Sequence, residues 1–316
     1  MNSKKHAKDA LKYLIVCHDA GGSEIISSWV KRHQENGYRF ILAGPAVGIF
    51  KGKLRKVRNT PVSLMRKYVC DSDRVLTGTS WGSDIEKRAI LIARENGVSV
   101  ASFMDHWVNY PQRFILDGKE VLPNEIWVGD AEAFALAKKY FPKAMVRLVS
   151  NPYFKDIKKE IKAKDKRRRS KGSPLRILYL CEPIANHVRK EFGDDNYYGY
   201  TEFDAMRNFL HHLPGIAGKY KTREIRIRQH PAEPKGKYRE LLKWHPSLRA
   251  VMSKGSSLVD DCLWADWIVG CESMALVIGL LASRKVFSVI PESGRACSLP
   301  HKNIVRLAIA PKEVKQ

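Results

Sequence analysis

The sequence predicts an α/β protein with two parallel β-sheets, each covered by helices on both faces. Short apolar runs alternate along the chain with longer segments whose apolar residues recur at helical spacing. Several of these runs lead into glycine-containing or polar loops, as buried parallel strands do. The 316 residues are enough for about two domains of ~150 residues each. We therefore expect two doubly wound domains.

The first half contains repeated strand–loop–helix units. Residues 13–17 (YLIVC) form an apolar run, and the segment 24–36 that follows has helical periodicity until Gly37 ends it. Units of this length favour parallel strands joined by crossover helices. The other expected strands are 40–43, 74–77, 98–104, 125–128 and 146–149, and the other expected helices are 84–96 and 131–140.

The second half repeats this architecture without repeating the sequence. Residues 224–228 (EIRIR) alternate as a strand does and end at a His-Pro pair. Residues 267–269 form a short apolar run that leads through Gly270 into an apolar helix. The expected strands are 176–180, 224–228, 248–252, 267–269 and 286–290, and the expected helices are 202–213, 258–264 and 273–281.

A charged segment separates the two halves. Residues 155–176 hold 11 Lys or Arg against 3 Asp or Glu, and their core is Lys166–Arg169. A Ser-, Gly- and Pro-containing stretch follows, which is typical of a domain boundary. We expect domains over 1–154 and 175–316, joined by a basic linker over 155–174 that is either solvated or in contact with an anionic surface.

The composition indicates a basic, soluble protein. Lys and Arg number 56 and Asp and Glu number 33, so the formal net charge is +23. This excess indicates anionic partners: nucleic acid, anionic lipid, phosphorylated small molecules or acidic glycans. The six cysteines lack CxxC or zinc-ligand spacing, so we expect reduced thiols in a cytoplasmic protein. The most apolar stretch, 264–282, contains Asp266 and Glu272 and predicts a buried strand and helix rather than a membrane span.

The segment Arg228-Gln229-His230-Pro231 follows a predicted strand, at the end where open parallel sheets bind ligands. Pro231 restricts His230 to extended backbone angles, which directs the imidazole out of the sheet edge. A histidine placed there can donate a hydrogen bond to a phosphate, with Arg228 beside it. The alternative is that His230 only caps a loop.

Two further loops of the second half are candidates for ligand binding. Ser273 is a natural N-cap, and the free N–H groups of the helix that begins at Met274 form an anion site. The alternative is a plain capped core helix. Glu182 follows the strand 176–180 and can accept hydrogen bonds from ribose hydroxyls, with an ordinary loop as the alternative.

The loop after the first strand contains a candidate general base. Asp19 precedes Gly21 and Gly22, and glycines there let a phosphate or an acceptor approach the backbone. The motif is not GxGxxG, so it does not predict a dinucleotide site. Asp19 can take a proton from an acceptor hydroxyl. Its alternative role is to cap the next helix.

A second candidate base follows the strand 98–104. Asp105 and His106 stand at the strand end, with Arg113 close behind. Such a polar cluster is costly to bury unless its members meet a polar ligand or one another. Asp105 is therefore either a general base or an ion-pair partner for His106 or Arg113.

These motifs resemble those of glycosyltransferases with the GT-B architecture. More narrowly, they look like bacterial-type enzymes that use CMP-activated acidic sugars, such as sialyltransferases and the transferases of other nonulosonic acids or Kdo. The likeness rests on the His-Pro pair at His230 and on the segment Gly270–Ala275 about forty residues later. It implies two Rossmann-like domains that face a cleft, with the acceptor domain first and the nucleotide-sugar donor domain second.

The resemblance also implies residue roles. His230 would contact the donor phosphate and assist the leaving CMP, while Ser273 and the backbone of Met274 hold the same phosphate. Asp19 is the closer match to the family's acidic base. The sequence departs from the pattern at Ala20 and at Cys271-Glu272-Ser273, which stands in place of a Ser-Ser pair. Transferases that use CDP-glycerol share a similar His-Pro and Ser pattern.

The expected activity is metal-independent transfer of an acidic sugar from a CMP-linked donor to a glycan or lipid-linked acceptor, without a further cofactor. Asp71-Ser72-Asp73 lies beside a predicted turn and Asp260-Asp261 in a predicted helix, so neither predicts a metal site. The basic exterior would also hold the enzyme at an anionic membrane surface, on the inner face of the cell membrane.

Two alternatives remain open from the sequence. One is a UDP-sugar transferase or epimerase of the same architecture. The other is a nucleic-acid-binding protein in which Lys166–Arg169 contacts phosphates. No helix-turn-helix, zinc-finger, RRM or KH signature supports nucleic-acid binding.

Overall fold

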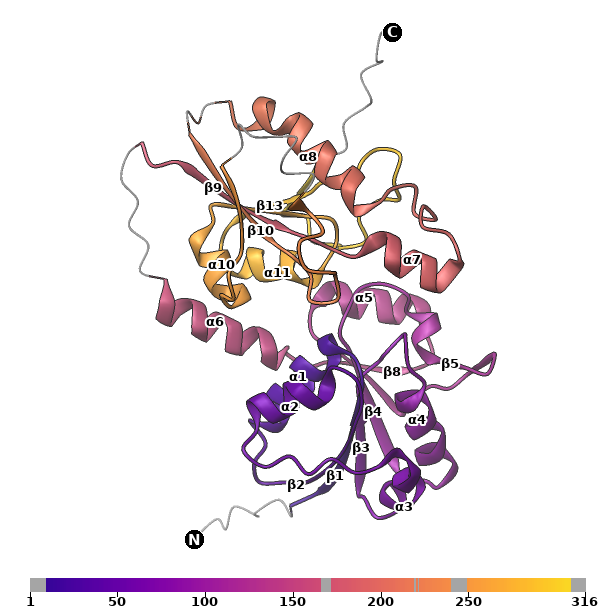
Figure 1. Cartoon of the computed structure of the whole chain (residues 1–316). Helices are drawn as coiled ribbons and strands as arrows, with labels where there is room; N and C mark the ends of the chain where they lie inside the picture. The colour runs from indigo at the N-terminus through magenta and orange to yellow at the C-terminus, as the bar shows by residue number, and fades with distance from the viewer. Residues whose placement is uncertain (1–9, 166–171, 219, 221, 240–248, 308–316) are drawn as a thin grey trace. The chain divides into compact units, whose positions relative to one another are not determined.

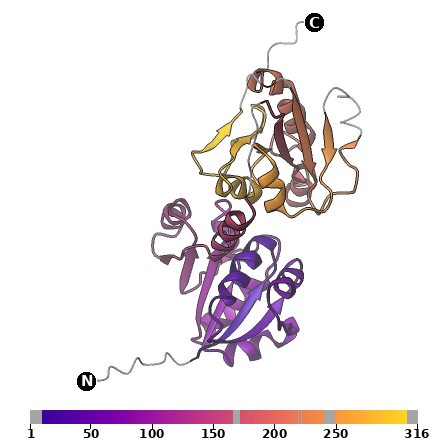
Figure 2. The ribbon, with the colours of Figure 1, turned by 90° about the vertical axis from the view of Figure 1, so that its left-hand side faces the viewer.

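The computed structural model describes residues 10–165, 172–218, 220, 222–239 and 249–307. The chain divides into two compact units, Met1–Asp156 and Ile157–Gln316. Each unit contains a six-stranded sheet in which all neighbouring strands are parallel (Figures 1 and 2). These two sheets confirm the predicted α/β fold class.

The N-terminal unit has the following elements: β1 (Lys12–Cys17), α1 (Ala20–Val30), β2 (Gly37–Leu42), α2 (Ala46–Lys53), η1 (Val62–Leu64), α3 (Met65–Cys70), β3 (Arg74–Thr77), α4 (Ile85–Glu95), β4 (Ser99–Met104), η2 (Pro111–Phe114), β5 (Ile115–Leu116), β6 (Lys119–Glu120), β7 (Glu125–Val128), α5 (Ala131–Tyr140) and β8 (Met145–Leu148). The strand order is β2-β1-β3-β4-β7-β8. The chain goes from β1 to β2 and then returns past β1 to β3 and the later strands, and α1 and α4 cover opposite faces of the sheet (Figure 1).

The C-terminal unit has a second set of elements: β9 (Leu175–Leu180), α7 (Ile184–Phe192), α8 (Glu202–Ile216), β10 (Arg223–Arg228), β11 (Ala250–Met252), α10 (Leu258–Trp264), β12 (Trp267–Gly270), α11 (Met274–Leu281), β13 (Lys285–Ser288) and β14 (Ile304–Arg306). The order is β11-β10-β9-β12-β13-β14. Thr201 and Asp204 form a capping box that fixes the start of α8. The apolar stretch predicted to be buried is β12 and α11.

Every strand predicted from the sequence is present, with bounds shifted by three residues or fewer. The largest difference in the first half is at α1, which spans Ala20–Val30 rather than 24–36, so it begins four residues earlier and ends six residues earlier than expected. Gly21 and Gly22 therefore lie in its first helical turn and not in a loop. In the second half α8 continues past Pro214 to Ile216. The helices α2, α3, α6 (Pro152–Lys164) and α7 and the strands β5, β6 and β14 are not among the elements expected from the sequence.

The segment predicted as a basic linker, 155–174, begins inside a helix. α6 (Pro152–Lys164) buries Ile157 and exposes most of its lysines. Lys164 pairs with Glu160 at 2.6 Å and with Asp260 at 2.9 Å. The two compact units divide within this helix, after Asp156. The cluster Lys166–Arg169 lies outside the described residues.

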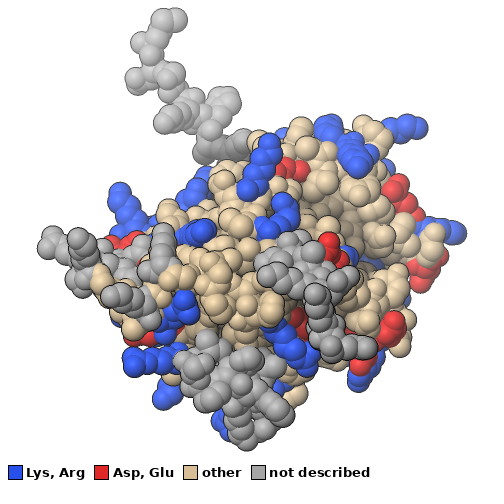
Figure 3. All heavy atoms as spheres, turned by 90° about the horizontal axis from the view of Figure 1, so that it is seen from above, with Lys and Arg blue, Asp and Glu red and all other residues tan. Residues whose placement is uncertain are grey.

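The basic surface and the free cysteines agree with what the composition predicts. Figure 3 shows Lys and Arg spread around the face that it presents, with fewer Asp and Glu between them. All six cysteines are free, and four of them are buried. Within the described ranges, the structure contains no helix that combines the length and the apolar character needed to cross a membrane.

Candidate functional site

Each sheet has one point where the chain reverses its direction of travel across the strands. Open parallel sheets bind ligands beside such points. In the N-terminal unit this point lies between β1 and β3, which lead to Asp19 and to the segment 78–81. In the C-terminal unit it lies between β9 and β12, which lead to Glu182 and to the segment 271–273.

Asp19 forms a pair with its neighbour His18 at the end of β1. The imidazole Nδ1–H donates to Asp19 Oδ1 at 2.6 Å, and the N–H of Trp81 donates to Oδ2 at 3.3 Å. Asp19 occupies the N-cap position of α1, but its side chain makes no capping hydrogen bond. Its side chain is 38 % exposed. The carboxylate is thus oriented by the protein and still accessible, as a general base must be.

Asp105 forms a buried ion pair with Arg113. Arg113 Nη1 donates to Asp105 Oδ1 at 2.7 Å and to the carbonyl oxygen of Thr79 at 2.6 Å. The side chain of Asp105 is 13 % exposed and that of Arg113 is 7 % exposed. The ion-pair role that the sequence left open is the one the structure shows. His106 packs edge-on against Trp107, with ring centroids 5.6 Å apart.

The glycines after Asp19 make room for the protein rather than for a ligand. A Cβ on Gly21 would lie 2.1 Å from Asp105 Oδ2, and a Cβ on Gly22 would lie 3.2 Å from the Cα of Gly78. Helix α1 therefore packs directly on the loops that follow β3 and β4. The expected loop is wrong, because Gly21 and Gly22 lie in the first turn of α1. A contact of a phosphate or an acceptor with these glycines stays a prediction.

Glu86 is a third carboxyl group at this edge, and it is not among the site residues predicted from the sequence. It is 2 % exposed, and its Oε1 accepts the backbone N–H of His18 at 2.8 Å. Its Oε2 has no hydrogen-bond partner among the described residues. Burial raises the pKa of Glu86 to about 8, and the negative charges of Asp19 and Asp105 act in the same direction. The available signal was its position on the buried stripe of α4, with Ala89, Ile90 and Ala93.

His230 follows β10 in a tight turn closed by a hydrogen bond from the N–H of Glu233 to its carbonyl oxygen at 3.0 Å. Pro231 occupies the second position of this turn, where its fixed φ is favourable. The imidazole Nδ1 accepts the N–H of Ala232 at 3.2 Å, which leaves the proton on Nε2. The residue is exposed at the surface, but partial desolvation by its surroundings lowers the pKa of His230, so the ring is neutral near pH 7.

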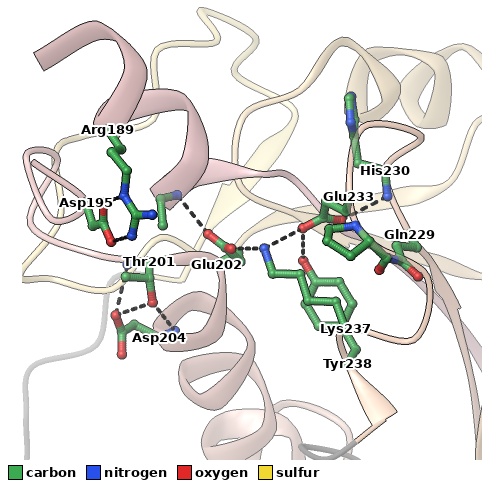
Figure 4. Close-up of polar contacts among 12 residues, drawn as sticks. Arg189, Asp195, Thr201, Glu202, Asp204, Gln229, His230, Glu233, Lys237 and Tyr238 are labelled. Atoms are coloured by element: carbon green, nitrogen blue, oxygen red, sulfur yellow. Dashed lines mark hydrogen bonds and ion pairs between the residues drawn. The ribbon is translucent and has the colours of Figure 1, made fainter. Parts of the chain in front are cut away.

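A buried network holds the His230 turn in place (Figure 4). Glu233 Oε2 accepts the backbone N–H of His230 at 3.1 Å, while Oε1 accepts from Tyr238 at 2.6 Å and from Lys237 at 3.0 Å. Lys237 also pairs with Glu202, whose other oxygen accepts the N–H of Ala185 at 2.8 Å. Figure 4 shows the imidazole directed away from this network. The network therefore positions the backbone and leaves Nε2 open.

Arg228, predicted to bind the donor, is part of the protein's own ion-pair cluster. It donates to Asp261 Oδ2 at 2.7 Å, and Arg226 donates to Oδ1 at 2.8 Å. The hydroxyls of Ser253 and Ser256 donate to the same buried carboxylate, each at 2.6 Å. Burial opposes ionisation of Asp261, but these hydrogen bonds outweigh it and hold its pKa below the ordinary value. Arg228 thus stabilises the β10–α10 packing. Its side chain is still 30 % exposed, so the binding of a donor by Arg228 stays a prediction.

Glu182 follows β9, and its carboxyl group contacts the loop between β12 and α11. Its Oε1 accepts the N–H of Cys271 at 2.8 Å and that of Glu272 at 3.0 Å. Burial raises the pKa of Glu182 to about 7, while these backbone hydrogen bonds partly oppose the rise. Both oxygens of Glu182 already accept hydrogen bonds from backbone N–H groups. The expected hydrogen bond from a ribose hydroxyl stays a prediction, and it would have to share these oxygens.

Ser273 is the N-cap of α11, as predicted, but its hydroxyl makes no capping hydrogen bond. The first N–H of this turn with a backbone acceptor is that of Leu276, which donates to the carbonyl of Ser273 at 3.0 Å. Among the described residues, no acceptor faces the N–H groups of Met274 and Ala275. This helix start therefore keeps two backbone donors and one hydroxyl for an anion.

In the described part of the chain, no group of three or more His, Cys, Asp or Glu side chains is arranged to hold a metal ion. The carboxylates at the β1 edge are instead bound to His18, to Arg113 and to backbone donors.

Comparison with known proteins identifies the fold. The sequence matches no protein-family model and no curated protein. Among solved structures, the UDP-GlcNAc 2-epimerase of Neisseria meningitidis bound to UDP-GlcNAc is similar over 88 % of this chain and 82 % of its own, with a TM-score of 0.58 and 11 % identity. The corresponding enzyme of Methanocaldococcus jannaschii is similar over 88 % and 83 %, with a TM-score of 0.56 and 12 % identity. The chain has a GT-B-like fold.

A putative UDP-N-acetylglucosamine 2-epimerase of Listeria monocytogenes shows the same likeness. It covers 88 % of this chain and 79 % of its own, with a TM-score of 0.57 and 11 % identity. At identities this low, the likeness establishes the fold alone.

Proposed function

We propose that this GT-B-like protein is a glycosyltransferase that takes its sugar from a nucleotide-activated donor. The observation that carries the proposal is the geometry of His230 at a strand end, where Nδ1 accepts the N–H of Ala232 and the imidazole is directed away from the network that holds the turn (Figure 4). The lowered pKa of His230 fits this assignment. Donation of that hydrogen to the donor phosphate stabilises the charge that develops as the sugar–phosphate bond breaks. Ser273 and the N–H of Met274 supply further donors for the same phosphate.

The proposed base is Asp19. It takes the proton of the acceptor hydroxyl while that oxygen forms the new bond to the sugar, and the nucleotide leaves with the bonding electrons. Of the carboxyl groups at this edge, Asp19 is the accessible one, since Asp105 is held by Arg113 and Glu86 is 2 % exposed. Asp105 orders the loop that packs on α1.

Epimerisation of a UDP-linked sugar is the second candidate, because the proteins of similar fold carry that name. The three carboxyl groups of Asp19, Glu86 and Asp105 favour it, since inversion at carbon by proton transfer needs one group to remove a proton and another to return one. A single accessible carboxylate instead suits one proton removal. We therefore place transfer first.

Thermal unfolding with CMP, CDP, UDP and GDP tests the donor site. A nucleotide at a hundredfold excess over its Kd stabilises the folded protein by about 2.7 kcal/mol. We expect one nucleotide to do so, His230→Ala to abolish the effect, and His211→Ala, an exposed control, to retain it. The predicted CMP-linked acidic donor requires CMP to be that nucleotide. No stabilisation by any nucleotide contradicts the proposal.

The reaction itself is tested by following the nucleotide and the sugar separately. A transferase releases the free nucleotide only when an acceptor is present, and Asp19→Asn removes this release while it preserves nucleotide binding. Conversion of UDP-GlcNAc to its 2-epimer without an acceptor, followed by NMR, would instead establish the epimerase.

A further inference from the structure

The N-terminal unit has a groove away from the strand ends that lead to Asp19 and Asp105. Its volume is about 720 Å³, and it lies between the C-terminal ends of α1 and α2 and the edge strand β2. Tyr38, the second residue of β2, lines it, so it opens near the amino end of the sheet. Phe40, the fourth residue, also lines it, and the carboxyl end of β2 lies about 7 Å beyond Phe40, at ~3.3 Å per residue.

The groove lies in the most one-sidedly charged part of this unit. Residues 36–70 hold eight Lys or Arg and no Asp or Glu. Lys31, Lys53, Arg55 and Lys56 line the groove. Lys53 pairs with Glu24 and donates to the hydroxyl of Ser28 at 3.1 Å. The other three cations are exposed and have no ion-pair partner among the described residues.

Neighbouring acidic side chains and helix C-termini neutralise only part of the positive charge of the groove. Asp156, which lies near Lys31, is held by Arg32 Nη2 at 2.6 Å and Nη1 at 3.2 Å. The C-termini of α1 and α2 each contribute about half a negative charge. The four cations that line the groove carry a charge of +4. Glu24 and the two helix ends together offset about two of these charges, so the groove keeps a net charge of about +2. The surplus indicates an anionic ligand.

The shape of the groove selects among anionic ligands. Its volume is in the range of about 300–1,000 Å³ that is typical of sites for small organic molecules. Tyr38 offers a partly buried ring, against which the apolar face of a sugar can pack, and Gln34 offers an amide. A bilayer surface cannot enter a hollow of this kind, and nucleic acid is bound along a longer track of phosphates.

We propose that this groove binds an anionic saccharide, with its carboxylate or phosphate on Lys31, Arg55 and Lys56 and a sugar ring against Tyr38. The inference deepens the proposed function, on which it rests: the acceptor is an acidic glycan, and the groove holds a part of it that does not react. Binding in the groove is nevertheless separate from donor binding, because the groove lies on β2 and the donor site in the C-terminal unit.

The test uses the full chain and a fluorescently labelled oligogalacturonate hexamer, followed by fluorescence anisotropy. We expect binding that weakens with salt, and no binding of the uncharged maltohexaose. The triple variant Lys31→Ser, Arg55→Ser, Lys56→Ser should weaken binding at least about tenfold, since each exposed cation contributes a modest amount. The control Lys138→Ser, Lys139→Ser, Lys143→Ser removes the same charge from exposed positions of the same unit and should keep most of the affinity.

Equal losses in the two triple variants would overturn the proposal, and so would the absence of oligogalacturonate binding in the unaltered protein. Binding to phosphatidylglycerol vesicles or to duplex DNA that depends on the groove cations, without oligogalacturonate binding, would also overturn it. Nucleotide-induced stabilisation is measured on the same variants. Its retention in the groove variant separates the groove from the donor site, and its absence in every protein contradicts the transferase alone.

Discussion

The carboxyl group of Glu182 accepts the N–H of Cys271 at 2.8 Å, so the end of β9 is fastened to the end of β12. These two strands flank the point where the C-terminal sheet reverses its order. The sequence predicts that an anion binds at the start of α11. In the fold, the carboxyl group of Glu182 lies beside the loop that leads into this helix. A donor phosphate on Ser273 would therefore lie close to a group whose pKa is about 7.

Nucleotide binding should consequently take up a proton near neutral pH. A phosphate near Glu182 favours the neutral carboxyl, so affinity falls as pH rises above about 7, by up to about tenfold per pH unit. Glu182→Gln should remove this dependence. The measurement is calorimetric titration between about pH 6 and pH 8. The ionisation of the nucleotide itself contributes equally to the native protein and to Glu182→Gln, so it cancels when their pH profiles are compared. Glu292→Gln, at an exposed position, is the control. Identical pH profiles for the native protein and Glu182→Gln would contradict the placement of the phosphate.

Glu86 should make the stability of the N-terminal unit fall as pH rises from acidic to slightly alkaline values. Its pKa is raised from 4.5 to about 8 in the folded state, so the folded protein holds a proton that the unfolded chain has lost. The free energy of unfolding therefore falls as pH rises from about 4.5 to about 8, with a slope of up to about 1.4 kcal/mol per unit. Urea unfolding of Glu86→Gln should lack this slope. Glu95→Gln, at the exposed end of the same helix, should keep it.

Lys237 should be needed to hold the His230 turn. Its ammonium group lies between the buried carboxylates of Glu202 and Glu233. Lys237→Met leaves both without their cation, so we expect a loss of about 3 kcal/mol in the free energy of unfolding, measured by denaturant titration. Lys235→Met, an exposed neighbour, should change stability by less than about 0.5 kcal/mol. A loss as small for Lys237→Met would show that the network does not anchor the turn.

The strands were predictable because their signal is local. Runs such as 74–77 and 125–128 are apolar, short and bounded by turn residues, and the observed β3 and β7 match them. Helix α6 was missed because its charged face dominates the composition of 155–164, although Ile157 and Ile161 recur at helical spacing. Helix α1 was predicted too late because two glycines favour a loop, whereas here they permit close packing.

The site was predictable only in part, for the same physical reason. The sequence shows which polar residues follow strands, and Asp19, Asp105, Glu182 and His230 all do. Whether a carboxylate stays accessible depends on partners that are distant in sequence. Arg113, in η2, contacts Asp105, which is 8 residues away along the chain, and Thr79, which is 34 residues away. Arg228 likewise forms an ion pair with Asp261, which is 33 residues away along the chain.

The contact between Gly21 and Asp105 can be tested by a single methyl group. In a helix, alanine is favoured over glycine by up to about 1 kcal/mol, so Gly21→Ala would stabilise an open helical site. Here the added Cβ would lie 2.1 Å from Asp105 Oδ2 and would displace it from Arg113. We therefore expect Gly21→Ala to lower the free energy of unfolding by about 1–3 kcal/mol. Gly48→Ala is the matched control, because this helical glycine has no atom within 4 Å of an added Cβ and should gain up to about 1 kcal/mol. Opposite signs for the two substitutions, measured by urea unfolding, would show that Gly21 is required by the Asp105–Arg113 pair and not by a phosphate. A gain in stability for both would mean that Asp105 moves aside without cost, and the pair would then lose its assigned role in ordering the β4 loop.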